Sequence, residues 1–282
     1  MKKSLFIVIC TSLMMFASSS CARTEESVSQ IQDEDKELLS LKNQLEALNA
    51  TLPEKVEPTR AAWWKYLIVA AADAGGFFLA GASGYNAVSA ACTASTLAWN
   101  VVKEDMKTAT RSFGESDQVS LRDPEIALSK VNGEGLLHNK IIISMYNDFG
   151  EDLFSMKEDD LLPEVTDRVS RETGEVVSDD VLLVAKQRAV VSKTVRAYEE
   201  SDTVDEFIEK LSLSAPEKAS LLELVNVILE GFDKIDPIQD DGKYNDAVMD
   251  LVSGADISRE SKETLSSTTS VANASSRLWK MD

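Results

Sequence analysis

The chain has 282 residues, of which 48 are Asp or Glu and 29 are Lys or Arg, so its formal net charge is −19. A surface this acidic repels nucleic acids and anionic lipid headgroups, and we therefore exclude nucleic acid as a partner. The length is enough for one large domain or two small ones with hydrophobic cores of their own.

The first 20 residues are typical of a secretory signal peptide. Two lysines near the start are followed by an apolar segment over residues 5–16, and small residues then precede Cys21. The apolar segment is too short to be a membrane-spanning helix. Small residues directly before a cysteine resemble the lipobox of bacterial lipoproteins, in which that cysteine is acylated after cleavage. We expect Cys21 to carry lipid and anchor the protein to a membrane; the alternative is ordinary cleavage near residues 17–22, which leaves a free thiol.

Residues 21–58 are predicted to form a tether and an amphipathic helix. The first part is polar and charged, and a leucine stripe with helical spacing follows it, made of Leu38, Leu41, Leu45 and Leu48. This stripe is too short for a coiled coil, so we expect a helix that docks on the rest of the protein. Pro53 and Pro58 end the helix and form a linker.

Residues 59–113 predict an Ala/Gly-rich hairpin of two antiparallel helices with a turn at residues 83–86. Between Lys65 and Lys103 the only formal charge is Asp73. Small residues four apart on the first helix allow the backbone of a second helix to come close, and these are Gly76, Ala80 and Gly84.

The same apolar stretch leaves open whether the hairpin is buried in a bundle or inserts into a membrane. Residues 66–84 are long enough to span, but Asp73 lies in their middle, and Ala, Gly and Ser contribute little transfer free energy. Trp63, Trp64 and Trp99 lie where interfacial aromatic residues of a membrane hairpin would be. We favour the buried hairpin and keep the membrane-inserting or pore-forming hairpin as an alternative.

Residues 114–282 are predicted to be an acidic helical domain that packs with the hairpin. Residues 114–125 form a loop, and the last helix is rich in Ser and Thr and is expected to be amphipathic at best. The expected helix ends are a stop at Gly150 and caps at Ser178 or Asp179, Asp202 or Thr203, and Ser214. No strong alternation of β-branched residues occurs, so we predict an all-α multi-helix bundle containing the hairpin, preceded by the signal peptide and tether helix.

His138 is the only histidine, and it lies on an apolar helical stripe with Ile141, Met145 and Phe149. A lone histidine in such a stripe is more often a hydrogen-bonded core residue than a catalytic group. A hydrolase-like enzyme would have to use this residue together with nearby carboxylates. The sequence has none of the common nucleotide-binding, nucleophile-elbow or zinc-protease motifs, and we predict no cofactor and no metal.

The stretch Gly135-Leu136-Leu137-His138-Asn139, followed by an apolar helix, resembles a short segment of uncharacterised bacterial secreted lipoproteins. Some of these proteins also carry an Ala/Gly-rich hydrophobic segment upstream, as residues 66–98 do here. The resemblance implies location and architecture only, and it makes His138 and Asn139 the first residues to consider as a binding site. We expect a non-enzymatic, lipid-anchored cell-envelope protein that binds an unknown protein partner.

Overall fold

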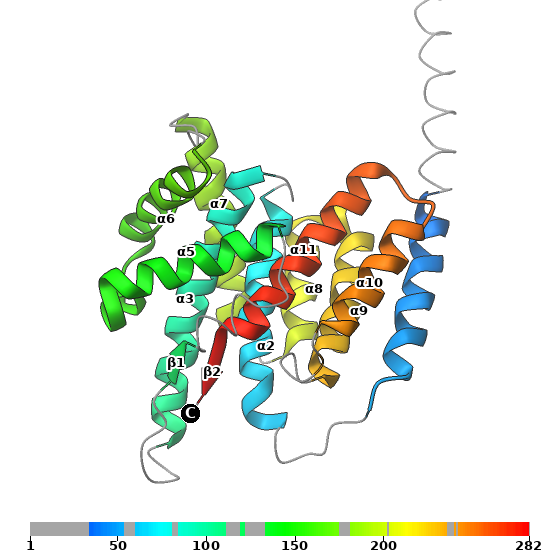
Figure 1. Cartoon of the computed structure of the whole chain (residues 1–282), viewed down its shortest axis with the longest axis horizontal. Coiled ribbons are helices and arrows are strands. Elements are labelled where there is room, and N and C mark those ends of the chain that lie inside the picture. Colours follow the sequence, from blue (N-terminus) through cyan, green and yellow to red (C-terminus); the bar gives the residue numbers. More distant parts are fainter. Residues whose placement is uncertain are drawn as a thin grey trace, which may run out of the picture.

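The computed structural model describes residues 34–53, 60–80, 84–110, 119–121, 133–174, 181–201, 203–235, 240 and 242–281. Over these residues the protein is an all-α multi-helix bundle, which confirms the predicted fold class (Figure 1). The predicted signal peptide, Cys21 and the predicted cap at Ser178 or Asp179 lie outside the described residues.

The described helices follow one another along the chain. An unlabelled helix over residues 34–50 comes first. It is followed by α2 (Arg60–Leu79), α3 (Gly84–Thr110), α5 (Gly133–Phe149), α6 (Glu158–Thr173), α7 (Val181–Glu199), α8 (Val204–Ser214), α9 (Ala219–Lys234), α10 (Lys243–Gly254) and α11 (Arg259–Leu278). The 3₁₀ turns η2 (Gly150–Ser155) and η3 (Pro216–Lys218) extend α5 and precede α9. The short strands β1 (Val119–Leu121) and β2 (Trp279–Met281) pair in antiparallel register.

The centre of the bundle is the apolar helix α2, shown in cyan in Figure 1. Residues 69–78 of α2 are buried, and α3, α7, α8, α9 and α11 all contact this helix. A helix covered on every side can be apolar around its whole circumference. Small residues make the contact with α3 close, because a Cβ atom added to Gly76 would lie 3.1 Å from Ala94 Cβ. Of the two other predicted packing residues, Ala80 is half-buried and Gly84 is the first residue of α3.

The second central helix is α11, which was expected to be amphipathic. That expectation holds for the first half of the helix, where buried and exposed residues alternate, but it is wrong for residues 268–278, which are buried without interruption. Small Ser, Thr and Ala side chains let α2, α5, α9 and α10 pack against this helix. Several of its hydroxyl groups bond within the helix itself, as when Thr269 donates to the Leu265 carbonyl at 2.7 Å and Ser276 to that of Asn273 at 2.8 Å. Polar side chains satisfied in this way can be buried at little cost. The buried hydroxyls of Thr268 and Ser275 have no hydrogen-bond partner among the described residues.

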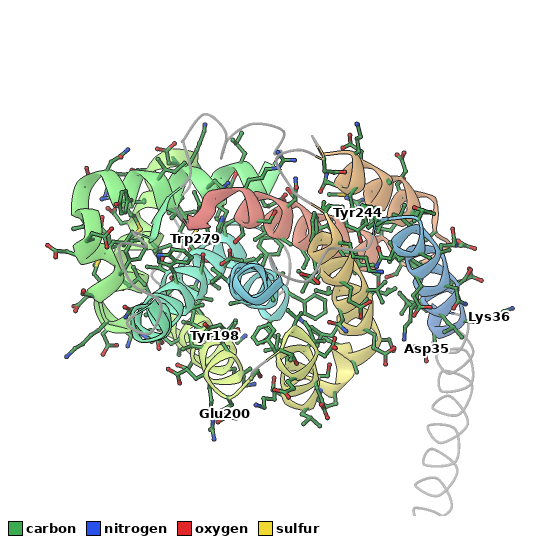
Figure 2. All side chains as sticks on the ribbon, turned by 90° about the horizontal axis from the view of Figure 1, so that it is seen from below. Asp35, Lys36, Tyr198, Glu200, Tyr244 and Trp279 are labelled. Atoms are coloured by element: carbon green, nitrogen blue, oxygen red, sulfur yellow. The ribbon has the colours of Figure 1, made fainter. Side chains whose placement is uncertain are left out.

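Aromatic residues close the end of the core where the chain terminates. Trp279 stacks on Trp99 with a ring-centroid distance of 4.5 Å, and Phe154 lies 6.1 Å from Trp279. Both tryptophans are almost fully buried. Figure 2 shows the Trp279 and Tyr244 side chains among the helices, whereas Lys36 and Glu200 point outward. The strand pair at this end was not expected, since residues 114–125 were predicted to be a loop and Trp279 to end a helix.

Three helix boundaries test the predicted caps and turns. Thr203, one of the two predicted alternatives, is an N-cap, and its hydroxyl accepts a hydrogen bond from the Glu206 amide. The other alternative, Asp202, lies outside the described residues. The predicted cap at Ser214 is wrong, because its hydroxyl donates to the Leu211 carbonyl at the end of α8, and η3 separates it from α9. The predicted turn at residues 83–86 is also shifted, because α3 already begins at Gly84.

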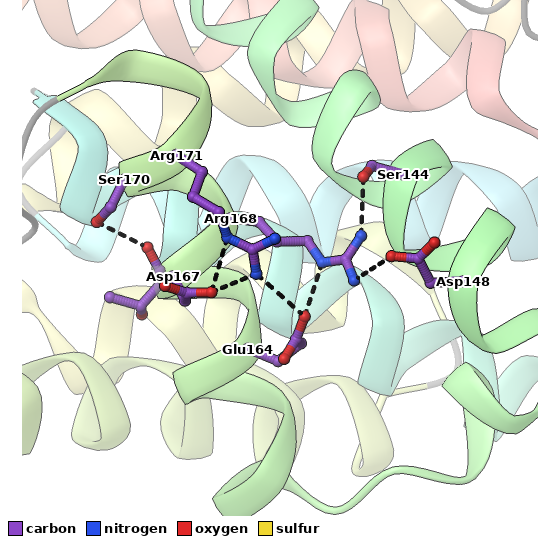
Figure 3. A network of polar contacts seen from close by, with 8 residues as sticks. Ser144, Asp148, Glu164, Asp167, Arg168, Ser170 and Arg171 are labelled. Carbon is purple, nitrogen blue, oxygen red and sulfur yellow. Dashed lines mark hydrogen bonds and ion pairs between the residues drawn. The ribbon is translucent and has the colours of Figure 1, made fainter.

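An arginine network ties α6 to α5 (Figure 3). The Arg168 guanidinium donates to Glu164 at 2.8 Å within α6, and it reaches Ser144 at 2.8 Å and Asp148 at 2.7 Å on α5. The same group lies 5.4 Å from the centre of the Phe149 ring. Only 7% of the Arg168 side chain is exposed, so this charge is satisfied by the protein rather than by water.

The helix over residues 34–50 is docked on the body of the protein. Its leucines Leu38, Leu41 and Leu45 are buried. Near its C-terminal end, Asn49 donates to the Val227 carbonyl of α9 at 2.7 Å and accepts from the Tyr244 hydroxyl of α10 at 2.9 Å. Tyr244 Oη fills the space above Gly231, where an added Cβ would lie 1.8 Å from it. This helix is therefore part of the folded core.

We predict that Gly231→Ala destabilises the protein by about 1–3 kcal/mol, because a methyl group there displaces Tyr244 Oη from Asn49. The control is Gly254→Ala, since an added Cβ at Gly254 has no atom within 4 Å. Urea unfolding of both variants measures the difference. Equal stability of Gly231→Ala and wild type would contradict the tight packing at this position.

Candidate functional site

The single charge of the apolar stretch and the single histidine meet in the core. Asp73 lies in the middle of α2 and His138 lies in the second turn of α5. Their side chains are 0% exposed, and His138 Nε2 is 3.4 Å from Asp73 Oδ2. This distance is that of an ion pair and is long for a hydrogen bond. Each of the two is a polar residue within an otherwise apolar stretch. This is the one feature of the sequence that indicates the pairing.

The other ring nitrogen of His138 is also engaged. Its Nδ1 lies 2.9 Å from Asn139 Oδ1, and Asn139 Nδ2 donates to the Ala274 carbonyl of α11 at 2.8 Å. Both atoms that face the imidazole are hydrogen-bond acceptors, an arrangement that suits a ring carrying a proton on each nitrogen. The polar chain from Asp73 through His138 and Asn139 to Ala274 therefore links α2, α5 and α11.

The protonation of this site follows from burial and from the Asp73 carboxylate. Burial alone lowers the pKa of His138, but the charge of Asp73, its contact with the ring and the Asn139 hydrogen bond together raise this pKa above its ordinary value. Burial, and then the Asp73 charge, raise the pKa of the Cys92 thiol well above its usual range. Cys92 Sγ lies 3.7 Å from the His138 carbonyl oxygen, to which it donates. The thiol therefore stays protonated and poorly nucleophilic.

The glycine that opens the Gly135–Asn139 stretch has a packing role. A Cβ atom at Gly135 would lie 2.4 Å from the Ser270 carbonyl oxygen and 2.9 Å from Ala274 Cβ on α11. Gly135 and Asn139 are one helical turn apart, so both contact α11, while His138 reaches Asp73 on α2. The Gly135–Asn139 stretch therefore brings α5 close to α11 and places the Asp73–His138 pair beside this contact.

The geometry of this site favours structure over catalysis. A general base needs a nitrogen within reach of a substrate, but both His138 ring nitrogens have partners in the protein and the side chain has no exposed surface. Among the residues that the structure describes, no group of three or more His, Cys, Asp or Glu side chains is arranged to hold a metal ion. Asn139 is likewise fully buried.

A surface cleft of about 420 Å³ lies where the helix over residues 34–50 meets α9 and α11. Glu34 Oε1 accepts from the Ser261 hydroxyl at 2.8 Å and from the Ser258 amide at 3.4 Å, and the hydrogen bonds from these two serines lower the pKa of Glu34. Lys218 donates to the Phe78 carbonyl at 3.0 Å. Two further carboxylates line the cleft, Asp35 and Glu260.

Cys21, the predicted lipidation site, lies outside the described residues. Over the helices that the structure describes, none combines the length and apolar character needed to cross a membrane. Comparisons with models of protein families, with characterised proteins and with solved structures find no match to this chain.

We predict that Asp73 and His138 are energetically coupled. Removing one partner of a buried ion pair costs about 3–5 kcal/mol, so Asp73→Asn and His138→Gln each lower the free energy of unfolding. The double variant leaves no unpaired charge, so it should be more stable than the sum of the single effects predicts, by between about 0.5 and 3 kcal/mol. Urea unfolding of the four proteins measures the coupling. Additive effects would show that the two side chains do not interact.

Proposed function

We propose that this protein is an exported, non-enzymatic helical protein of a bacterial cell envelope, anchored by lipid on Cys21 and acting by binding another protein. The observation that carries the proposal is the burial of residues 69–78 by five surrounding helices. Because the bundle itself covers the apolar stretch, the hairpin needs no bilayer to shield it. Membrane attachment is then left to the lipid on Cys21.

The length of the predicted tether supports an anchored body. Residues 22–33 separate Cys21 from the docked helix, whose first described residue, Glu34, already bonds to α11. Twelve residues span at most about 40 Å when fully extended. A lipid on Cys21 would thus hold the acidic body close to the membrane, where it can meet other envelope proteins.

A protein-binding role rather than catalysis is supported by the burial of the reactive side chains His138 and Cys92 in the core. Its only histidine has protein partners on both ring nitrogens, and the Cys92 thiol is held protonated in the core. Neither is available to a substrate. The net charge of −19 favours partners with basic surfaces, because complementary charge speeds association and orients it.

We predict that Cys21→Ser, expressed with its signal, is released as a soluble protein, whereas the wild type stays with membranes and incorporates a labelled fatty acid. The matched control is Cys92→Ala, which removes a buried thiol and should leave lipid incorporation and membrane attachment unchanged. Fractionation before and after carbonate extraction measures the attachment.

Two outcomes would contradict this proposal. If Cys21→Ser resists carbonate extraction, the hairpin over residues 59–113 is itself a membrane-inserting device, and leakage of dye from liposomes becomes the relevant assay. If the wild type incorporates no fatty acid and is soluble, Cys21 is not an anchor.

A further inference from the structure

The helix α5 lies across the hairpin. It contacts α3 and α11, and Figure 1 shows it running crosswise in front of α3 and reaching α11. We call this helix, Gly133–Phe149, the α5 strap. Its N-terminal half is held by Gly135 against α11, by Asn139 on the Ala274 carbonyl, and by His138 against Asp73. Cys92 of α3 lies beneath it and donates to the His138 carbonyl.

Among these contacts, the ion pair is the one that can be switched. Neither carboxylate oxygen of Asp73 receives a hydrogen bond from a described residue. The 3.4 Å contact with His138 is therefore what offsets the cost of burying the Asp73 charge. While the imidazole is protonated, the two charges neutralise each other. When the imidazole loses its proton, a buried carboxylate is left without a counter-charge, which disfavours the closed arrangement.

We propose that Asp73 and His138 form a pH-sensitive lock, which holds the α5 strap across the α2–α3 hairpin while the imidazole is protonated and lets it open when the proton is lost.

The direction of the switch follows from proton linkage. In the closed protein the pKa of His138 is raised, because the charge of Asp73, its contact with the ring and the Asn139 hydrogen bond together outweigh burial. In an opened strap the exposed imidazole has a pKa of about 6.5. Between these two values the closed form binds one more proton than the open form, so rising pH favours opening by up to about tenfold per pH unit. The stabilisation of the closed form is complete below the pKa of the open form and is lost above the pKa of the closed form.

Other charged groups do not account for this switch. On α3, the Cys92 thiol faces the strap but stays protonated. On α11, the Arg277 guanidinium is buried and bonds to Asn273 Oδ1 at 3.3 Å. On α6, Arg168 pairs with Asp148, about three turns further along the strap than His138. Glu134 and Lys140 are the charged residues of the strap nearest to His138 in sequence. Among the charges of the described residues, it is Asp73 that raises the pKa of His138.

The rate of Cys92 alkylation reports opening of the strap, because the thiol lies beneath it. The rate is measured on the folded full chain by mass spectrometry of the Cys92 peptide and divided by the rate in the unfolded chain at the same pH. The control is the double variant Asp73→Asn/His138→Gln. It keeps side chains of similar shape but removes both titratable groups. For the wild type we expect the relative rate to rise by up to about tenfold per pH unit above about pH 6.5 and then level off. For the double variant we expect no such rise.

If the relative rate of Cys92 alkylation depends on pH in the same way in the wild type and the double variant, the proposed lock is wrong. Amide hydrogen exchange gives a second measurement that needs no variant. If the strap opens as a unit, the amides of α5 are less protected than those of α9, and their protection factors fall over the same pH range. Equal protection of α5 and α9 at every pH, or protection of α5 that does not change with pH, would also overturn the proposal.

Discussion

Small side chains let α3 pack closely on α2 and α5 pack closely on α11, so that an imidazole and a carboxylate are enclosed between these helices. Gly76 lets α3 approach α2, and Gly135 lets α5 approach α11 to the point where a methyl group would overlap the Ser270 carbonyl. At this separation no water is needed between the helices, and the Asp73–His138 pair has 0% exposure. The remaining helices cover these central helices with their apolar faces. Their charged faces make the acidic surface.

The sequence predicts the parts of this structure that depend on hydrophobic periodicity. It predicts the all-α fold, the docked leucine helix and a cap at Asp202 or Thr203, because each leaves a local pattern. It underestimates the burial of α11, since hydropathy ranks Ser and Thr as surface residues and cannot show that a hydroxyl such as that of Thr269 bonds to its own helix. It also misses the strand pair, because β1 and β2 are three residues each and their paired residues Ser120 and Lys280 are 160 positions apart.

The central pair illustrates what a single sequence lacks. Asp73 and His138 can each be identified as an exception within an apolar stripe, but they are 65 positions apart, and nothing local indicates that α5 meets α2 at this level. The same holds for Asn49 and Tyr244, whose hydrogen bond fixes the first helix to α10 across 195 positions. Long-range polar contacts of this kind depend on the register of helix packing, which side-chain volumes set jointly across several helices.

The His138 imidazole is the most direct probe of this account, because the chain has no other histidine and its ring signals can be assigned without ambiguity. A titration of these signals by NMR between about pH 5 and pH 9 gives its pKa in the folded protein. If the Asp73 carboxylate outweighs burial, the pKa lies above about 6.5, the value of an exposed imidazole. A pKa below that value would show that the histidine is buried as a neutral ring, and it would contradict a charged pair at the centre of the bundle.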